Sequence, residues 1–333
     1  MQLRFITGMG LVLLFLGGCT QKVTIKALEP AQIDRVAYTK RIAITNFTND
    51  KVGLSAKIEA KLAQFQIDGK KYFRVISRND LEKVIHEQKL QNSGLVDEKT
   101  AVQLGEIVGA QALISGRVSS PTKQDSYFYE PRIRCVDLKC KQIETYEVRC
   151  MKRAFSLSAD IKIVDVAKTD IIYADILTKG SVYKHCSDDS HALPSTEMAA
   201  QNLATQIADT FSYKLTPHYK NFCVALLEKP DLDYNDREKK LLKVSLEYIA
   251  QGRYDKAEDL LGRLVDATHE KSYVPFYNLG VIKEAEGKYK EAQEYYDMAD
   301  HLMIEPVKEI NSAVLRIRKL IAKKEKTMEQ LQR

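Results

Sequence analysis

Cysteine is the residue type with the most chemical potential in this sequence. Five of the six cysteines lie far from the amino terminus, at Cys135, Cys140, Cys150, Cys186 and Cys223. Thiols can form disulfides or bind zinc, but thiolate zinc sites usually contain a Cys-x2-Cys pair, and that spacing is absent here. The spacing therefore favours disulfides over a metal. Because five is odd, at least one of these thiols remains outside an intramolecular bridge.

A second group of potential ligands lies between His185 and His191. It contains these two histidines, Cys186, Asp188 and Asp189, which could bind a metal, although a solvated polar loop explains the same composition. The sequence has no glycine-rich phosphate loop, no Gly-x-Ser-x-Gly and no His-Glu-x-x-His motif. We therefore expect no metal, no cofactor and no enzymatic activity.

The remaining cysteine, Cys19, ends a segment typical of secreted proteins. Arg4 precedes an apolar stretch from Phe5 to Leu16, which is shorter than the roughly 20 residues of a membrane-spanning helix. Leu16-Gly17-Gly18-Cys19 looks like a lipobox, which implies removal of residues 1–18 and attachment of fatty acyl chains such as palmitate to Cys19. An ordinary secretory signal is the alternative. Thr20 replaces the aspartate of inner-membrane lipoproteins, so we expect an anchor on the periplasmic face of the outer membrane.

Composition and charge agree with a globular periplasmic protein. Removal of 18 of the 333 residues leaves 315, enough for two domains. The chain is 44% hydrophobic and 29% charged, with a net charge of +6. This mild charge gives no argument for a nucleic-acid partner, and the oxidising periplasm permits disulfides.

Residues 40–216 predict a layered α/β domain with a mixed sheet. We expect strands at 41–47, 73–76 and 112–118, separated by helices that begin near Leu54, Asn79 and Asp97. Alternating apolar residues from Phe155 predict an antiparallel hairpin that turns at 167–170, followed by a polar loop at about 183–194 and a helix capped by Ser195 or Thr196. Residues 19–39 show no sustained period and indicate a lipidated tether.

Residues 237–328, after a linker at 217–236, predict an all-α repeat domain. Gly252-Arg253-Tyr254 recurs 35 residues later as Gly287-Lys288-Tyr289, which resembles the 34-residue tetratricopeptide repeat. Small residues such as Gly280 would let the two helices of a repeat approach, and a charged helix at 307–328 would form the cap. This geometry places Tyr277, Val281 and Glu284 in a concave protein-binding groove.

The segment from Tyr72 to Val118 resembles the CsgG/HfaB family, which is named after the curli secretion channel. The resemblance rests on Phe73-x-Val75-Ile76-x-Arg78, Leu81, Glu87-Gln88, Ser93-Gly94-Leu95-Val96-Asp97, Leu104-Gly105, Gly109-Ala110 and Gly116. It covers about residues 38–215. The family also includes lipoproteins that activate cell-wall synthases (the LpoB type) and periplasmic adhesin-anchoring proteins, and the resemblance implies that the chain is not an enzyme.

The sequence departs from the family's channel in both segments that would enter the membrane. That channel inserts two hairpins per subunit, and each spanning strand needs about 9–11 residues with an apolar outer face. Residues 119–153 are rich in charged side chains, and residues 179–195 are too few to cross twice. We therefore expect a water-soluble relative of the channel.

The combined interpretation is a non-enzymatic outer-membrane lipoprotein that acts in the periplasm as an accessory or scaffold for the assembly or secretion of an envelope structure. It would bind periplasmic or outer-membrane proteins through its repeats and could self-assemble as a homo-oligomer. One alternative is an oligomeric export channel. Another is an LpoB-like activator of a peptidoglycan synthase, for which a tether of about 20 residues is short.

Overall fold

The computed structural model describes residues 21–77, 81, 83 and 98–332. The signal peptide, Cys19, the helix expected after Asn79 and the Ser93–Asp97 motif lie outside the described residues. The chain divides into two compact units. Of the described residues, the sheet unit contains those within Leu28–His218 and residues 324–332, and the helical unit contains residues 21–27 and Tyr219–Lys323.

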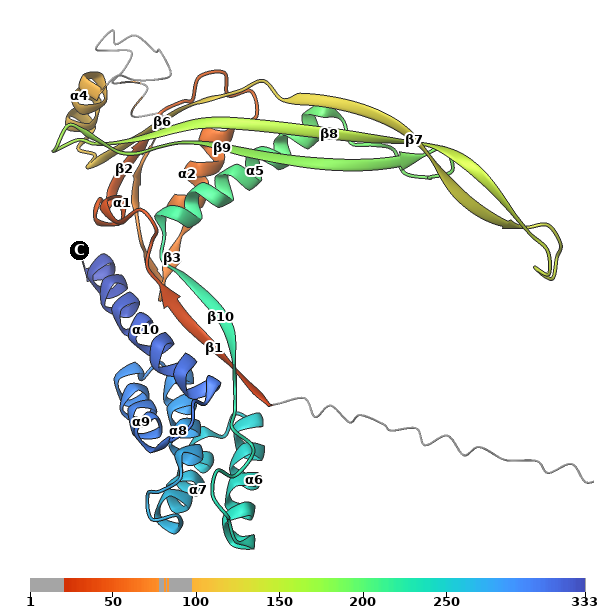
Figure 1. Ribbon diagram of the computed structural model, residues 1–333. Helices are drawn as coiled ribbons and strands as arrows, with labels where there is room; N and C mark the ends of the chain where they lie inside the picture. Colours follow the sequence, from red (N-terminus) through yellow and green to blue (C-terminus); the bar gives the residue numbers. More distant parts are fainter. Residues whose placement is uncertain (1–20, 78–80, 82, 84–97, 333) are drawn as a thin grey trace, which may run out of the picture. The chain divides into compact units, whose positions relative to one another are not determined.

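The sheet unit is built on a six-stranded mixed sheet with the order β5–β2–β6–β8–β7, and β9 also pairs with β8 (Figure 1). β2 (Arg41–Ile44) is its central buried strand and runs parallel to β5 (Arg74–Ile76) and β6 (Ala112–Val118). These strands coincide with the three predicted ones. The other strand pairs of this sheet are antiparallel, so the sheet is mixed, as the sequence predicts.

The antiparallel half of the sheet has much longer strands than the sequence predicts. β8 (Ile143–Asp165) pairs with β6, then with β7 (Thr122–Cys135) along one edge, and with β9 (Asp170–Cys186) along the other. The polar loop expected to begin near Tyr183 therefore starts only after Cys186. The sequence does not predict the extra strand length because this part of the sheet covers little apolar core. Its side chains are therefore mostly polar and show no apolar alternation.

Helices cover both faces of the sheet. α2 (Leu54–Gln64) and α5 (Thr196–Leu215) pack with Ile42 and Ile44 in one core, and α4 (Glu98–Val108) packs with Ala43 in another. Successive side chains of β2 therefore pack into two cores on opposite faces of the sheet. Ser195 caps α5 as predicted, since its side chain accepts a hydrogen bond from the Met198 amide at 3.1 Å.

Short elements and a carboxy-terminal helix complete the sheet unit. α1 (Asp34–Tyr38) precedes β2, and β3 (Gln66–Ile67) forms a tight hairpin with β4 (Lys70–Lys71). The last turns of α10 (Lys308–Gln332) dock on this unit through the buried amide of Gln330. Its Oε1 accepts from the Ala31 amide at 2.9 Å and its Nε2 donates to Asp34 at 2.8 Å.

The helical unit contains two helix pairs, which are α6 (Asp236–Ala250) with α7 (Tyr254–Ala267) and α8 (Tyr273–Ala285) with α9 (Tyr289–Leu302). Gly252 and Gly287 lie in the turns at φ +70° and +73°, a conformation that favours glycine. A Cβ on Gly280 would lie 2.6 Å from the Tyr296 ring. The predicted close approach of paired helices is therefore present.

Two strands occur where the sequence suggested a tether and a linker. β1 (Lys22–Glu29) pairs with β10 (His218–Ala225). Val23, Ile25 and Ala27 alternate into the core of the helical unit. The expectation of unstructured segments was therefore wrong here, because this ladder joins residues that are distant in sequence. Among the described residues, no helix is long and apolar enough to cross a membrane.

Candidate functional site

The most distinctive surface of the sheet unit is the outer end of the β7–β8 hairpin. β9 ends at Cys186, which is paired with Cys150, so that from Arg149 to Ile143 strand β8 pairs only with β7. We name this two-stranded part, Phe128–Cys135 with Ile143–Cys150 and the loop between them, the distal ribbon. It continues past the end of β9 (Figure 1), and an isolated ribbon of this kind is marginally stable without further support.

Disulfides lie at both ends of the distal ribbon. Cys150–Cys186 joins β8 to the end of β9 at its base, and Cys135–Cys140 closes the loop at its tip. Cys223 is the exposed free thiol and lies in β10. The preference for disulfides and the leftover thiol are therefore confirmed, and the Cys150–Cys186 pairing follows from the register of β8 and β9.

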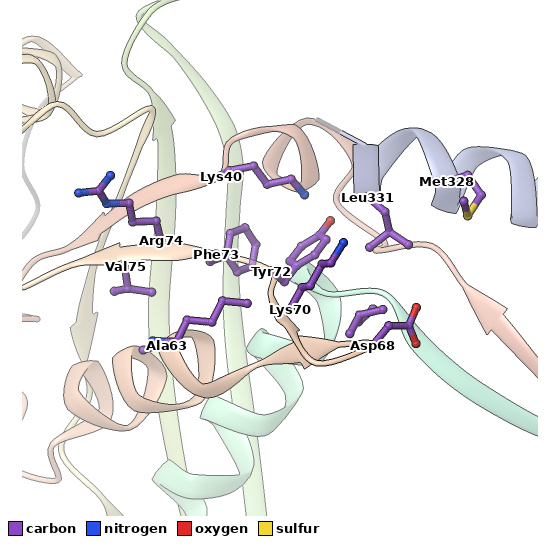
Figure 2. Close-up of a pocket in the computed structure, with 12 residues that line it drawn as sticks. Lys40, Ala63, Asp68, Lys70, Tyr72, Phe73, Arg74, Val75, Met328 and Leu331 are labelled. Atoms are coloured by element: carbon purple, nitrogen blue, oxygen red, sulfur yellow. The ribbon is translucent and has the colours of Figure 1, made fainter.

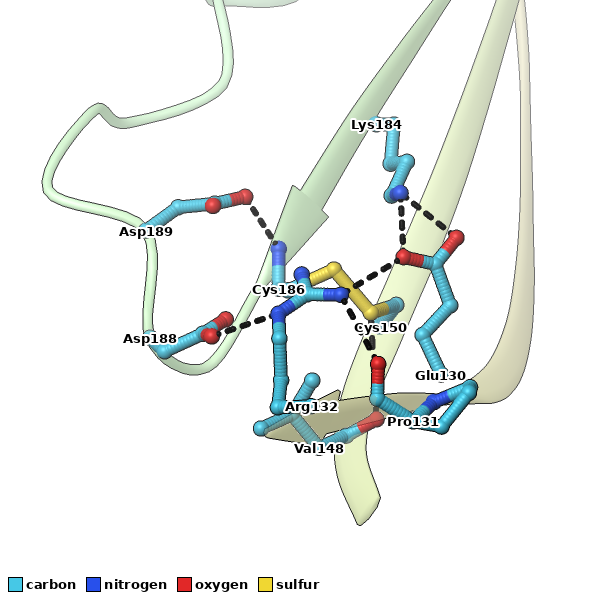
Figure 3. Close-up of a disulfide and its surroundings, with 9 residues drawn as sticks. All are labelled: Glu130, Pro131, Arg132, Val148, Cys150, Lys184, Cys186, Asp188 and Asp189. Atoms are coloured by element: carbon cyan, nitrogen blue, oxygen red, sulfur yellow. Dashed lines mark hydrogen bonds and ion pairs between the residues drawn. A yellow bond between two sulfur atoms is a disulfide. The ribbon is translucent and has the colours of Figure 1, made fainter. Parts of the chain in front are cut away.

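Ion pairs surround the disulfide at the base (Figure 3). Lys184 donates to both oxygens of Glu130, and Arg132 donates to Glu130 at 3.1 Å and to Asp188 at 2.9 Å. Hydrogen bonds from Lys184 and Arg132 hold the pKa of Glu130 below its usual value, and the bond from Arg132 does the same for the pKa of Asp188. These ion pairs link β7 to the end of β9 across β8.

Four of the five potential ligands between His185 and His191 are engaged in other contacts. Cys186 is in the disulfide, Asp188 pairs with Arg132, and Asp189 accepts from the Cys186 amide at 2.6 Å. His191 instead contacts Ser190. Among the described residues, the ligand atoms of Glu130, Cys150 and Cys186 do come within 4.8 Å of one another, but both sulfurs are bonded to each other and are not thiolates.

The tip of the distal ribbon exposes apolar side chains on a loop that a disulfide closes. Ile133, Val136 and Ile143 are 67%, 59% and 64% exposed, and Leu138 is fully exposed. Asp137 holds the loop, since its carboxylate accepts from the Lys141 amide at 2.7 Å and its carbonyl accepts from the Cys140 amide at 3.1 Å. We call these four apolar residues the apolar tip. A group of exposed apolar residues at one place is typical of an interaction site.

Sequence reasoning treated residues 119–153 only as a charged segment and missed the apolar tip. Val136 and Leu138 stand between the two cysteines that close the loop. A bridge between Cys135 and Cys140 closes a loop too tight to bury the side chains inside it. Given that bridge, the sequence indicates that Val136 and Leu138 are exposed.

Charged residues interrupt both faces of the distal ribbon. One face carries Tyr129 and Ile133 but also Glu147 and Arg149, and the other carries the Arg134–Glu144 ion pair at 2.8 Å. Residues 179–186 belong to β9 and pair with β8, so no second projecting hairpin forms there. Both expected departures from a channel subunit are therefore visible in the described structure.

The helical unit does not present the predicted groove residues to a partner. Tyr277, Val281 and Glu284 are 1%, 0% and 0% exposed. The expectation that they line an open groove was wrong, because other segments of the same chain cover this side of α8. The Tyr277 hydroxyl donates to the Ala225 carbonyl at 2.8 Å.

The chain segment between β10 and α6 covers part of α8 through hydrogen bonds between side chains and backbone groups. The Asn278 side chain accepts from the Leu227 amide at 3.0 Å and donates to the Leu227 carbonyl at 2.9 Å. Asp231 accepts from the Tyr273 amide at 2.8 Å. This extended segment therefore occupies α8 much as a bound peptide would, which an isolated repeat pattern cannot predict.

A buried ion pair accounts for the third predicted residue. Arg316 of α10 donates to the two oxygens of Glu284 at 2.7 and 2.8 Å, and the Tyr296 hydroxyl donates to Glu284 at 2.6 Å. Burial is the main cause that raises the pKa of Tyr296. Glu284 is thus a structural anion rather than a contact for a partner.

An open hollow lies elsewhere on the helical unit, along α6. It has a volume of about 430 Å³, and residues of α6 that include Leu242, Lys243 and Leu246 line it together with Pro230. Mixed apolar and charged lining is common at protein-binding surfaces.

Residues 31–187 match the sequence model of the family described as "Curli production assembly/transport component CsgG". This match covers 157 of the 333 residues and marks them as a CsgG-like domain. The match includes the whole distal ribbon and both of its disulfides. The repeat-like helices lie outside it.

Solved structures also match, and two of them show low similarity to this chain. The "Crystal Structure of Lipoprotein GNA1162 from Neisseria meningitidis" has 12% identity and a TM-score of 0.25, and covers 52% of this chain and 94% of that one. The "PelC dodecamer from Paraburkholderia phytofirmans, space group P6" has 12% identity and a TM-score of 0.21, and covers 59% and 98%. At these scores neither carries an argument about this chain. No curated protein matches it.

Proposed function

We propose that this protein is a non-enzymatic outer-membrane lipoprotein that acts in the periplasm as an accessory or scaffold for the assembly or secretion of an envelope structure. In this proposal Cys19 carries the lipid anchor, the CsgG domain engages the envelope machine or further copies of the chain, and the repeat-like helices bind a protein. The observation that carries it is the distal ribbon of the CsgG domain, a disulfide-linked hairpin with the apolar tip at its end.

The geometry of the ribbon suits contact with a protein. Its base is held by a disulfide and by the ion pairs around Glu130, and its tip by a second disulfide. A binding element that is already ordered loses little conformational entropy on association. Leu138 and its apolar neighbours supply surface that a partner would bury.

The protein-binding role of the helical unit is assigned to surfaces other than Tyr277, Val281 and Glu284. The hollow along α6 is open, and its lining combines the apolar Leu242 and Leu246 with two lysines and two glutamates, which are Lys239, Lys243, Glu228 and Glu247. A partner segment with apolar residues and charges of both signs fits this lining.

An export channel is a less suitable function for this geometry. Glu147 and Arg149 lie on one face of the distal ribbon, and an arginine that faces lipid at the bilayer midplane costs about 2–4 kcal/mol. An LpoB-like role is also less suitable, because β1 begins at Lys22 and leaves little chain after Cys19 as a tether.

Two measurements test the proposal. The acylated protein is reconstituted in planar bilayers, and its oligomer size is measured alongside. We expect no unitary currents, whereas stable unitary currents from a large ring would replace the scaffold with a channel.

The second measurement is photo-crosslinking in cells with a photoreactive residue at position 138, and at the exposed position 168 as a matched control. We expect adducts with an envelope protein or a second copy at Leu138 and none at Lys168. Absence of adducts at Leu138 would contradict a docking role for the apolar tip.

A further inference from the structure

A pocket in the sheet unit has features of a ligand site that the proposed function does not use. It has a volume of about 620 Å³ and lies beside β5, the last strand of the sheet order (Figure 2). The end of α2, the β3–β4 hairpin, β5 and the last turns of α10 form its walls. The volume falls in the range of about 300–1,000 Å³ that is usual for small-molecule sites.

The walls of this pocket are largely apolar. Ile67 and Phe73 are buried, and Leu331 packs against the core of the sheet unit. Met328 of α10 lies on the opposite wall and is partly exposed. Figure 2 shows Leu331 and Met328 on the helix that faces the strand bearing Phe73. Such a surface would bury an alkyl chain favourably.

Positive charges surround the apolar walls. Lys40, Lys70, Lys71 and Arg74 line the pocket, against one carboxylate, that of Asp68. Within the part of the chain that the structure describes, none of these four cations forms an ion pair with a carboxylate. The excess of unpaired cations makes the pocket complementary to an anion.

Lys40 brings one of these charges next to the apolar wall. Its Nζ donates to the Gln330 carbonyl at 2.6 Å and lies 3.5 Å from the centre of the Tyr72 ring. Both partners are neutral, and burial lowers the pKa of Lys40 to about 8. A partly buried ammonium group with neutral partners gains from an added anion.

We propose that this pocket binds a single-chain anionic amphiphile, with its alkyl chain against Ile67, Phe73 and Leu331 and its carboxylate or phosphate head at Lys40 and Lys70, while Arg74 adds positive charge to the pocket lining. The pocket volume suits one chain of small-molecule size, and the cations select the charge of the head. The proposal does not depend on the envelope role, because it rests on this pocket alone.

The test uses the full mature chain with the Cys19→Ser substitution, so that no detergent is needed. Isothermal titration calorimetry measures binding of dodecanoate, dodecyl phosphate and the neutral dodecyl maltoside. We expect both anions to bind at least tenfold more tightly than the maltoside. The double variant K70Q/R74Q should weaken anion binding at least tenfold, and the matched variant K51Q/K168Q, which changes two exposed lysines outside the pocket, should leave it unchanged.

A second variant separates the pocket from surface charge. Ala63→Phe adds volume to the pocket wall without changing charge and should abolish dodecanoate binding, with folding checked by its melting temperature. Equal affinity for dodecyl maltoside and dodecanoate, or full binding by the Ala63→Phe variant, would overturn the proposal. Binding of hexaglutamate without dodecanoate would also overturn it and indicate an acidic peptide.

Vesicles distinguish the two sources of such a head group. Co-sedimentation with phosphatidylglycerol vesicles, but not with phosphatidylcholine vesicles, that is lost in K70Q/R74Q would identify a membrane lipid. Loss of dodecanoate binding alone in that variant would identify a free amphiphile. Either result requires the pocket cations, and an unchanged K70Q/R74Q variant in both assays would contradict the proposal.

Discussion

Arg316 and Glu284 form a bidentate ion pair in the core of the helical unit, with Nε–Oε1 and Nη2–Oε2 distances of 2.7 and 2.8 Å. Glu284 has no exposed surface. The repeat pattern predicted that Glu284 lies in a protein-binding groove. Its carboxylate instead binds Arg316 of α10 in the same chain. The pair therefore explains why the groove side of α8 is closed.

The ion pair predicts a large loss of stability when one partner is removed. Glu284→Ala leaves a mostly buried guanidinium and the Tyr296 hydroxyl without their acceptor, and should lower the free energy of unfolding by about 3–5 kcal/mol. Urea denaturation measures this change. Asp255→Asn removes the exposed Arg253–Asp255 pair and should change little. Similar small effects in both variants would contradict a buried structural role for Glu284.

Two helical glycines predict opposite effects of the same substitution. Gly280→Ala places a Cβ 2.6 Å from the Tyr296 ring and should destabilise the protein by about 1–3 kcal/mol. Gly262→Ala in α7 meets nothing within 4 Å and should stabilise it by up to about 1 kcal/mol through helix propensity. Thermal unfolding of both variants checks the sign, and a stabilised Gly280→Ala variant would show that the helices are not closely packed.

The Cys150–Cys186 disulfide at the base of the distal ribbon should stabilise the ribbon. C150S/C186S removes the link between β8 and the end of β9 and should reduce stability by about 2–4 kcal/mol. Amide exchange should accelerate in Phe128–Cys135, as followed by mass spectrometry. C135S/C140S opens a bridge with a sequence separation of only 5, so its effect should stay within the tip loop. Equal exchange in both double variants would exclude the base disulfide as the anchor.

Lys40 predicts a stability difference that changes with pH. Its pKa is about 8 in the folded chain, against 10.5 as the ordinary value. Between these values the unfolded state binds more protons at this position, so the contribution of Lys40 to stability rises with pH. The free energy of unfolding of the wild type minus that of Lys40→Met should therefore increase from pH 7.5 to pH 9.5.

The groups that contact Lys40 do not titrate between pH 7.5 and pH 9.5 in the folded chain. Burial raises the pKa of Tyr72 well above its ordinary value, and the Gln330 carbonyl has no titratable proton. The matched Lys51→Met variant at an exposed position should show a difference that is constant with pH. A constant difference for Lys40→Met as well would contradict desolvation of this ammonium group.

The sequence by itself determined the elements whose apolar residues repeat with a clear period. The alternation of Phe155, Leu157 and Ile161 predicted half of β8, and helical spacing predicted α2 and α5. The motifs between Tyr72 and Val118 identified the CsgG domain, and the recurrence of Gly252 and Gly287 identified the helix pairs. Local periodicity is sufficient in these cases because each element buries one continuous face.

Only the tertiary structure decided which distant residues meet. The outer halves of β7 and β8 carry charged residues on both faces, so no period marks them, and β1 pairs with β10 across almost two hundred residues. The partners of Cys150, Glu284 and Lys40 also come from other elements. Burial and pairing of such residues depend on strand register and helix docking, and sequence spacing alone contains neither.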